Sequence, residues 1–352
     1  MKGKQLIFNS PGKVDIQSFD IPKPNDLQIL TKTECTLISP GTELASFNAL
    51  PNTSTVFPKI VGYSNVGRVI EVGKKIENIK IGEKIASHGK HASHSIIEAT
   101  MQPLRKLGET IDPTQNIGEK QVLTLAKQIP KEANSKHATF GSLGTVCLQA
   151  IRKARIELGE SVLIIGLGVV GNLALQLAKL DGGHPVIGTD LIEKRLKLST
   201  ITGADKTINA STNNIEDSIK SMTNGNGANI VIETTGSPNP INIAFQSAAW
   251  HGRIVLLGST RGNTKEVNFY RDVHKKGLTI LGAHNSVRPI HETSPGFWTL
   301  ANDMKLILEL IQNNRLNIEP LITDTFHFSE GKKAFESVNE NKNNLGIIIN
   351  WE

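Results

Sequence analysis

The pattern of hydrophobic and polar residues changes near residue 160. From there to residue 281, short apolar runs alternate with longer amphipathic stretches. The apolar runs predict six strands, at 161–166, 185–189, 206–209, 229–233, 253–257 and 278–281. The amphipathic stretches predict helices at 170–180, 191–200, 215–222 and 240–249. Strands and helices that alternate in this way specify an α/β fold with a doubly wound parallel sheet, and six strands make a full Rossmann sheet.

The chain before and after this region has a different pattern. Up to about residue 150, short β segments such as 5–8, 28–31 and 67–72 are separated by turn residues, which is typical of a β-barrel domain. After residue 283 the pattern predicts helices at 301–312 and 331–339 and a last strand at 346–350. We expect this tail to rejoin the first domain. The predicted domains are 1–150 with 285–352, and 151–284.

The first strand of the alternating region leads into a glycine-rich turn, Gly166-Leu-Gly168-Val-Val-Gly171. Gly166 allows the tight turn, Gly168 leaves space for a pyrophosphate, and Gly171 lets the helix pack closely on the strand. The turn also contains Leu167, Val169 and Val170, and the helix that starts there presents free N–H groups to phosphate. The motif therefore predicts a dinucleotide cofactor.

Asp190 ends the second predicted strand, about 20 residues after the motif, where dinucleotide-binding chains carry an acidic residue. Its carboxylate would accept hydrogen bonds from the adenosine ribose and repel a 2′-phosphate, which favours NAD over NADP. Arg195, one helical turn later, would weaken that preference. In the alternative interpretation the glycines serve only packing, and Asp190 caps the helix predicted from 191.

Composition excludes several other classes. The net charge of +6 comes from scattered basic residues, and only 5% of the chain is aromatic, so we expect no nucleic-acid partner. Two cysteines cannot form a disulfide framework or a four-cysteine metal site. The longest apolar run is about half a membrane span, and no signal segment opens the chain. The prediction is a cytoplasmic protein with a small-molecule substrate and no membrane partner.

Segments along nearly the whole chain resemble the medium-chain dehydrogenase/reductase superfamily, the alcohol dehydrogenase-like proteins. Besides the glycine motif, they are 58–73, 81–85, 231–236, 252–258 and 328–335. The resemblance implies a GroES-like barrel beside the Rossmann domain, and a homodimer or other homo-oligomer formed through the edge of the Rossmann sheet. The further cofactor contacts that it implies are at Thr145, Thr234, Thr235, Gly258, Ser259, Ala283 and Asn285.

Zinc members of that superfamily hold a catalytic metal through Cys, His and a later Cys or Glu. The matching positions here are Pro40, Tyr63 with Ser64, and Gly141, from which a tetrahedral zinc site cannot be built. The four cysteines of the family's structural zinc lobe are also missing. The string Ser39-Pro-Gly-Thr-Glu43 resembles a zinc-less branch that includes bacteriochlorophyllide, sugar and cyclitol dehydrogenases. We therefore expect no metal.

Without zinc, an acid/base group must take the proton of the alcohol. Thr42 matches the family's hydroxyl that contacts the substrate oxygen, and Glu43 follows it. Tyr63 replaces the ligand histidine, and its pKa, about 10 in water, is predicted to fall beside the nicotinamide ring. His284 lies where the family chain passes the nicotinamide, so it is a candidate base. In the alternative interpretation Thr42 caps a helix, Tyr63 fills space and His284 faces solvent.

Three histidines and one long segment stand apart from this pattern. His88, His91 and His94 are spaced three residues apart, which on a strand places successive side chains on opposite faces and argues against a shared metal. The segment 96–121 fits no element, and its residues 112–118 are a candidate loop over the cleft.

The leading hypothesis is an NAD-dependent, zinc-independent oxidoreductase that acts on a secondary alcohol of a sugar, cyclitol or other polyol. One alternative is an NADPH-dependent quinone or enoyl reductase. The other is a non-catalytic NAD-binding protein.

Overall fold

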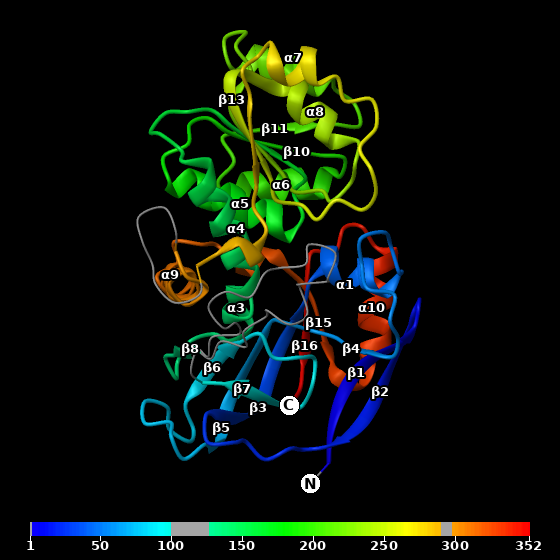
Figure 1. Cartoon of the computed structure of the whole chain (residues 1–352), viewed down its shortest axis with the longest axis vertical. Helices are drawn as coiled ribbons and strands as arrows, with labels where there is room; N and C mark the ends of the chain where they lie inside the picture. Colours follow the sequence, from blue (N-terminus) through cyan, green and yellow to red (C-terminus); the bar gives the residue numbers. More distant parts are fainter. Residues whose placement is uncertain (1, 100–126, 290–297) are drawn as a thin grey trace, which may run out of the picture.

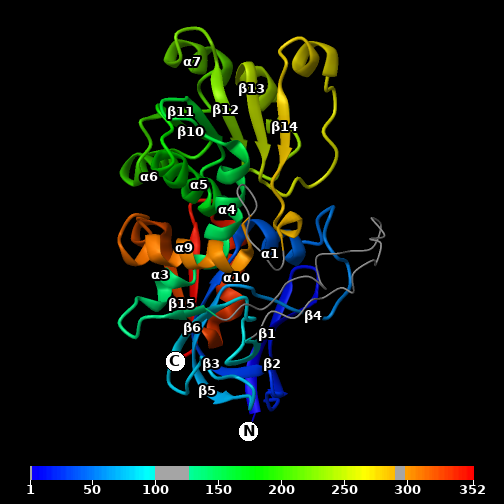
Figure 2. The ribbon, with the colours of Figure 1, turned by 60° about the vertical axis from the view of Figure 1, so that its left-hand side comes forward.

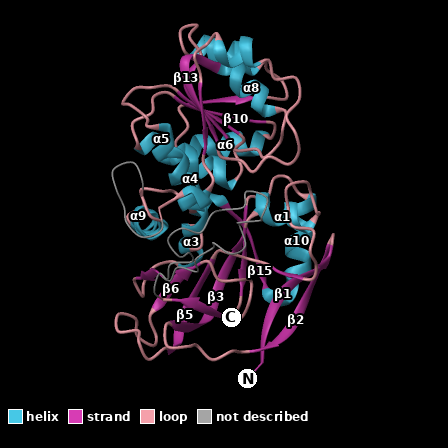
Figure 3. Ribbon diagram, viewed as in Figure 1, coloured by secondary structure: helices cyan, strands magenta, loops and turns pink. Residues whose placement is uncertain are grey.

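The computed structural model describes residues 2–99, 127–289 and 298–352. The chain forms two lobes, with the Rossmann lobe at the top of Figure 1, the barrel lobe at the bottom, and helix α4 (Gly141–Ala154) between them. The upper lobe is a sheet with helices packed around it, whereas the lower lobe consists mainly of strands (Figure 3). The fold is therefore a Rossmann domain with a GroES-like barrel, as the sequence predicts.

The upper sheet has six strands in the order β11-β10-β9-β12-β13-β14, and every neighbouring pair is parallel. Their bounds are β9 (Val162–Ile165), β10 (Val186–Asp190), β11 (Lys206–Asn209), β12 (Ala228–Glu233), β13 (Ala248–Leu256) and β14 (Thr279–Gly282). The four helices are α5 (Val169–Leu180), α6 (Glu193–Thr202), α7 (Ile215–Met222) and α8 (Pro240–Ser247). All ten predicted elements are confirmed, because apolar runs covered on both faces leave a clear pattern in the sequence.

Among these ten elements, the largest difference from a predicted boundary is at β13. β13 begins at Ala248, five residues before the predicted start at 253. Its ladder with β12 pairs Ala228 with Ala248 and resumes only at Ile230 with Arg253, so an irregular, partly exposed stretch lies between the two pairings. Trp250, which is largely exposed, lies in that stretch.

The lower lobe contains two sheets. A seven-stranded sheet has the order β15-β16-β3-β5-β6-β8 with β7 also on β3, and a smaller sheet has the order β2-β1-β4. The bounds of the larger sheet are β3 (Gln28–Ile38), β5 (Asn65–Val72), β6 (Lys84–Ser87), β7 (His94–Glu98), β8 (Lys127–Ile129), β15 (Ile322–His327) and β16 (Gly346–Asn350). The smaller sheet has β1 (Lys2–Ser10), β2 (Lys13–Asp20) and β4 (Lys59–Ile60).

The C-terminal tail lies in the lower lobe. β16 pairs antiparallel with β3, with Ile348 opposite Leu37, and α10 (Gly331–Glu340) packs its Phe335 ring against Phe8 at 5.0 Å. A further short helix, α1 (Pro40–Phe47), follows β3 directly. The two ends of the chain are thus joined in one sheet and one aromatic cluster.

A single apolar core runs through α4 from one lobe to the other. It includes Leu37 of β3, Leu148 of α4 and Ile164 of β9. α4 also lies against α9 (Leu300–Gln312), beside which it is seen in Figure 2. A Cβ atom at Gly144 would come 2.5 Å from Ile307 Cγ2, so glycine is needed for this close approach.

A buried ion network lies where α4 and α9 meet. Asp303 of α9 accepts from Arg152 Nε at 2.9 Å and pairs with Arg288, which also donates to the Thr145 carbonyl. Burial lowers the pKa of Arg288, and Asp303 acts in the opposite direction.

Two sequence expectations concern particular segments. The candidate loop at 112–118 lies outside the described residues. Among the helices that the structure describes, none has the length and apolar character needed to cross a membrane.

Candidate active site

The glycine-rich turn joins β9 to α5. Gly166 has φ +90°, in the left-handed region that favours glycine. A Cβ on Gly171 would lie 1.8 Å from the Gly166 carbonyl oxygen, so a side chain there would displace the turn, whereas the Cβ position of Gly168, the N-cap of α5, meets nothing within 4 Å. The turn thus combines close packing on one side with open space at the start of the helix, which suits a phosphate group.

Asp190 lies at the end of β10, next to this turn. Its Oδ2 accepts from the Leu167 backbone N–H at 2.7 Å, and its Oδ1 accepts from Ile192 N–H at 2.9 Å. The Arg195 guanidinium lies 3.6 Å from the same carboxylate and donates to the Lys342 carbonyl at 2.5 Å. The N-cap of α6 is Ile192, so the alternative in which Asp190 is the helix cap is wrong.

Other residues that the family resemblance assigns to the cofactor lie on α4 and on the segments that follow β12, β13 and β14. Thr234 donates to the carbonyls of Ile165 and Gly166 at 2.9 and 2.7 Å, so its side chain holds the turn itself. Thr235 donates through its backbone N–H to Glu233 at 2.7 Å. The remaining residues are Thr145, buried in α4, Gly258 and Ser259 on the loop after β13, buried Ala283, and Asn285, which accepts from Arg288.

Glu233, which the sequence pattern did not single out, is fully buried at the end of β12. Burial raises the pKa of its carboxyl group, while hydrogen bonds from Thr235 act in the opposite direction. Among the residues that the structure describes, its Oε2 atom has no hydrogen-bond partner. The sequence feature that could have identified Glu233 is its position as an acidic residue at the end of a predicted central strand.

A second polar cluster lies in the barrel lobe, at the start of α1. The Tyr63 hydroxyl donates to Ser39 Oγ at 2.5 Å. Burial raises the pKa of Tyr63 to about 12 and the Glu43 carboxylate adds to the rise, while the Ser39 and Thr42 hydroxyl groups partly offset it. The residues around Tyr63 therefore act against the predicted fall in its pKa and hold the phenol protonated.

The structure also corrects the alternative role of Thr42. α1 begins at Pro40, with Ser39 as its N-cap, so Thr42 lies inside the helix and is not its cap. Thr42 is exposed, and its hydroxyl group lowers the pKa of Tyr63. Thr42, Ser39 and Tyr63 thus place three hydroxyl groups together.

Glu43 points away from solvent and forms a buried chain of contacts. Its Oε2 accepts from Ser39 N–H at 2.6 Å, and its Oε1 lies 3.0 Å from His91 Nε2. The other ring nitrogen of His91 lies 2.7 Å from Thr36 Oγ1, which also accepts from Trp351 Nε1 at 3.0 Å. Glu43 Oε1 and His91 Nε2 are close, although neither atom forms a well-aligned hydrogen bond within the described residues.

His91 therefore supports the turn at Ser39, a role that the spacing of the histidines did not reveal. His94, by contrast, lies on β7 beside Ser93, with its Nδ1 3.0 Å from the Ser93 hydroxyl. Within the described ranges, no three His, Cys, Asp or Glu side chains are grouped so that they could hold a metal ion.

The positions that would carry zinc ligands contain no suitable donors. Pro40 begins α1, and the Tyr63 hydroxyl is bonded to Ser39. A Cβ atom at Gly141 would lie 2.9 Å from Met304 Sδ, so this position faces α9. A tetrahedral zinc ion does not fit this set of residues.

His284 lies at the N-cap of a short 3₁₀ turn, Asn285–Val287. Its Nδ1 lies 2.7 Å from Ser286 Oγ and accepts from Ser286 N–H at 3.2 Å. The ring is exposed, so its contacts within the described chain are those of a cap. Its role as a base stays a prediction.

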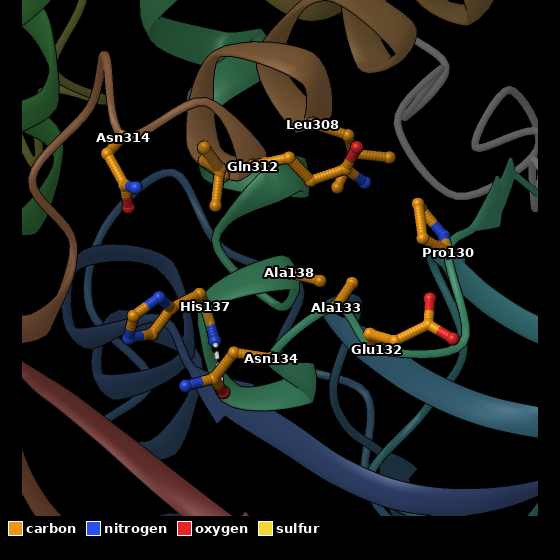
Figure 4. A pocket seen from close by; sticks show the side chains of 10 residues that line it. Pro130, Glu132, Ala133, Asn134, His137, Ala138, Leu308, Gln312 and Asn314 are labelled. Carbon is orange, nitrogen blue, oxygen red and sulfur yellow. Dashed lines mark hydrogen bonds between the residues drawn. The ribbon is translucent and has the colours of Figure 1, made fainter.

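A pocket of about 420 Å³ lies elsewhere, between α9 and the short helix α3 (Ser135–Ala138). Figure 4 shows Asn134 and His137 on one side of it and Leu308 and Gln312 of α9 on the other. Neither the glycine turn nor Tyr63 lines it. The pocket is therefore separate from the candidate site.

Comparisons with known proteins agree with the dehydrogenase fold. Residues 169–302 match the family model described as zinc-binding dehydrogenase. The L-threonine 3-dehydrogenase of Pyrococcus furiosus is 29% identical over 95% of this chain and 94% of its own length. The D-guloside 3-dehydrogenase of Escherichia coli (strain K12) is 26% identical over 78% of this chain and 72% of its own. A zinc-binding dehydrogenase of Sinorhizobium meliloti 1021, bound to NADP, superposes with a TM-score of 0.80 at 20% identity, covering 100% of both chains.

Proposed function

This chain belongs to the alcohol dehydrogenase-like, medium-chain dehydrogenase/reductase family, and we propose that it transfers hydride between NAD and a secondary alcohol of a sugar, cyclitol or other polyol, without catalytic zinc. The observation that carries this proposal is the hydroxyl cluster of Ser39, Thr42 and Tyr63 where the family places its metal. Polar groups of this kind suit a hydroxylated substrate. The relatives named for threonine and D-guloside also act, by their names, on hydroxylated compounds.

The glycine turn and Asp190 would hold the cofactor. NAD, when bound, supplies the hydride acceptor. The start of α5 would offer its free N–H groups to the pyrophosphate, and the Asp190 carboxylate would accept hydrogen bonds from the ribose hydroxyls. We infer a preference for NAD because this carboxylate would repel a 2′-phosphate, although Arg195 at 3.6 Å reduces its effective charge.

Tyr63 is the candidate for moving the proton. A phenol with a pKa of about 12 holds its proton near neutral pH, so it can donate to the oxygen of a ketone as hydride arrives at the carbon. In the opposite direction Tyr63 must first lose its proton to solvent, and the phenolate then takes the proton of the substrate hydroxyl as hydride leaves the carbon. Glu43 and His91 keep Ser39 in place. His284 is a second candidate base.

Turnover tests this proposal directly. The purified chain should reduce ketoses with NADH or oxidise polyols with NAD, and elemental analysis should find well under one zinc per chain. Activity that disappears with a chelator and returns only with zinc would contradict the metal-free mechanism. A strong preference for NADPH would favour the quinone or enoyl reductase alternative, and cofactor binding without turnover would favour the non-catalytic one.

We also propose that the chain forms a homodimer through β14. This strand ends the six-stranded sheet, and its Thr279 and Ile280 side chains are exposed. An uncovered edge with apolar character is a surface for pairing with a second copy. Light scattering should give twice the chain mass, and Ile280→Lys should reduce it to that of one chain.

A further inference from the structure

A series of buried polar contacts runs from the C-terminal end of the chain to the start of α1. Trp351, which follows β16, donates from Nε1 to Thr36 Oγ1 of β3 at 3.0 Å. The same Thr36 oxygen lies 2.7 Å from His91 Nδ1. His91 Nε2 lies 3.0 Å from Glu43 Oε1, and the other carboxylate oxygen of Glu43 accepts from the backbone N–H of Ser39 at 2.6 Å. Segments from both ends of the chain therefore meet at His91.

The hydrogen bonds of Thr36 determine which ring nitrogen of His91 carries a proton. An indole nitrogen can only donate, so the Thr36 oxygen accepts from Trp351 and must donate its own proton elsewhere. Thr36 is fully buried, and its other hydrogen-bond partner among the described residues is His91 Nδ1. A buried hydroxyl proton needs an acceptor, so Nδ1 is unprotonated. The ring is then neutral, with its proton on Nε2, the nitrogen that faces Glu43.

Glu43 Oε1 and His91 Nε2 are each other's nearest available partner. Both atoms are buried, and neither has a hydrogen-bond partner elsewhere in the part of the chain that the structure describes. The Glu43 and His91 side chains are 5% and 0% exposed, so bulk water does not reach them. Phe335, whose ring centroid lies 6.0 Å from that of His91, is uncharged. A buried carboxylate keeps its charge where donors hold it, and the donors here are the Ser39 N–H and the His91 Nε2–H.

The charge of Glu43 acts on Tyr63. The Tyr63 hydroxyl donates to Ser39 Oγ at 2.5 Å, while the Ser39 backbone N–H donates to Glu43, so one residue joins the phenol to the carboxylate. Burial raises the pKa of Tyr63, and the negative charge of Glu43 raises it further. Cys147 of α4 acts in the same direction with a smaller effect. A change in the charge of Glu43 would therefore change the proton affinity of the phenol.

We propose that His91 is a positioning residue for proton transfer, because its Nε2–H keeps the Glu43 carboxylate ionised and turned toward Ser39, so that Tyr63 remains a proton donor. His91 is fully buried and acts through Glu43. Trp351 contributes through Thr36, because its N–H fixes the proton of His91 on Nε2. This inference rests on the proposed function, in which Tyr63 moves the proton, and it identifies the residue that controls the charge beside it.

Two substitutions of His91 separate this role from packing. The amide nitrogen of glutamine reaches the position of Nε2, so His91→Gln keeps a donor for Glu43. The amide of asparagine reaches only the position of Nδ1, so His91→Asn loses that donor. Both variants lose the ring contact with Phe335, so a packing role would make them alike. Glu43→Gln removes the charge itself, and His94→Gln is the matched control, because it removes a histidine that contacts Ser93 instead.

The first measurement is the absorbance of tyrosinate, which needs no turnover. The chain has two tyrosines, and Tyr270 is exposed, so Tyr63 alone titrates in a Tyr270→Phe background. We expect Glu43→Gln and His91→Asn to lower the pKa of Tyr63 by about 1, which raises the phenolate fraction at about pH 10 roughly tenfold. His91→Gln and His94→Gln should change that fraction less than about twofold. Circular dichroism at the same pH confirms that each variant is folded.

The second measurement is made on the wild type. Nitrogen NMR of the chain with labelled histidine should show His91 as a neutral ring protonated on Nε2 near neutral pH, with its signal identified by its loss in His91→Gln. A charged ring, or a proton on Nδ1, overturns the proposal. So does a pKa of Tyr63 that is unchanged in His91→Asn, or one that falls as far in His91→Gln as in His91→Asn. Absence of turnover with every alcohol and ketone would instead refute the proposed function and leave the relation between His91, Glu43 and Tyr63 intact.

Discussion

Tyr63→Phe removes one hydroxyl group from the cluster at the start of α1 and keeps the aromatic ring. The lost atom donates to Ser39 Oγ at 2.5 Å, so the variant loses one partly buried hydrogen bond. Such a loss costs about 1 kcal/mol of folding free energy. For lobes of this size that corresponds to a fall in Tm of roughly 2–4 °C. The ring still fills the space, so the variant should fold, and changes in rate can be attributed to the hydroxyl.

The expected effect on rate follows from proton transfer. At pH 8, a pKa of about 12 leaves roughly one Tyr63 in 10,000 as phenolate, against about one in 100 for an ordinary phenol. The group is therefore a proton donor over the whole range from pH 6 to 10. Ketone reduction should be nearly independent of pH there, whereas alcohol oxidation should rise about tenfold per pH unit because it needs the deprotonated form. Tyr63→Phe should lower kcat by roughly 10²- to 10⁴-fold.

The assay is NADH absorbance in both directions from pH 6 to 10, with circular dichroism to confirm folding. Ser39→Ala is the matched control, because it removes the acceptor of the same hydrogen bond and keeps the phenol. It should reduce kcat much less than Tyr63→Phe does. A Tyr63→Phe variant with kcat within about threefold of wild type, and an unchanged pH profile, would show that Tyr63 only fills space.

Three further predictions concern other residues. Asp190→Asn should weaken NADH binding about 10-fold or more and raise the NADPH:NADH affinity ratio, measured by nicotinamide fluorescence, because the charge proposed to face the ribose is lost. An unchanged ratio would rule out its role in selectivity. Asp303→Asn should destabilise the chain by about 3–5 kcal/mol in urea unfolding, since it leaves buried Arg288 unpaired, whereas exposed Glu340→Gln should change it by less than about 0.5 kcal/mol. Burial raises the pKa of Glu233, so the ionisation of this residue destabilises the folded chain as pH rises through that pKa. Glu233→Gln should therefore be more stable than wild type at pH 8 and should lose this advantage below the ordinary carboxyl pKa of about 4.3. An equal stability difference at both pH values would refute this.

The Rossmann sheet could be predicted because the sequence patterns that specify its strands and helices lie within short segments. β9 is fully buried on both faces, so its residues form a continuous apolar run. In each following helix, apolar residues recur with the helical period. The glycine turn is also local, since the φ of Gly166 and the approach of Gly171 to Gly166 depend on residues five apart. The irregular start of β13 could not be predicted, because its first pairing depends on the partner strand.

The candidate site divides in the same way. The sequence by itself predicted a dinucleotide site and matched Pro40, Tyr63 and Gly141 with the positions of the family's zinc ligands. Only the tertiary structure decided that Glu43 meets His91 and that Arg261 contacts Asn52, since these pairs are separated by long stretches of chain. A motif fixes the backbone of its own few residues, whereas the pKa of a phenol depends on charges and burial that arrive only when distant segments pack together.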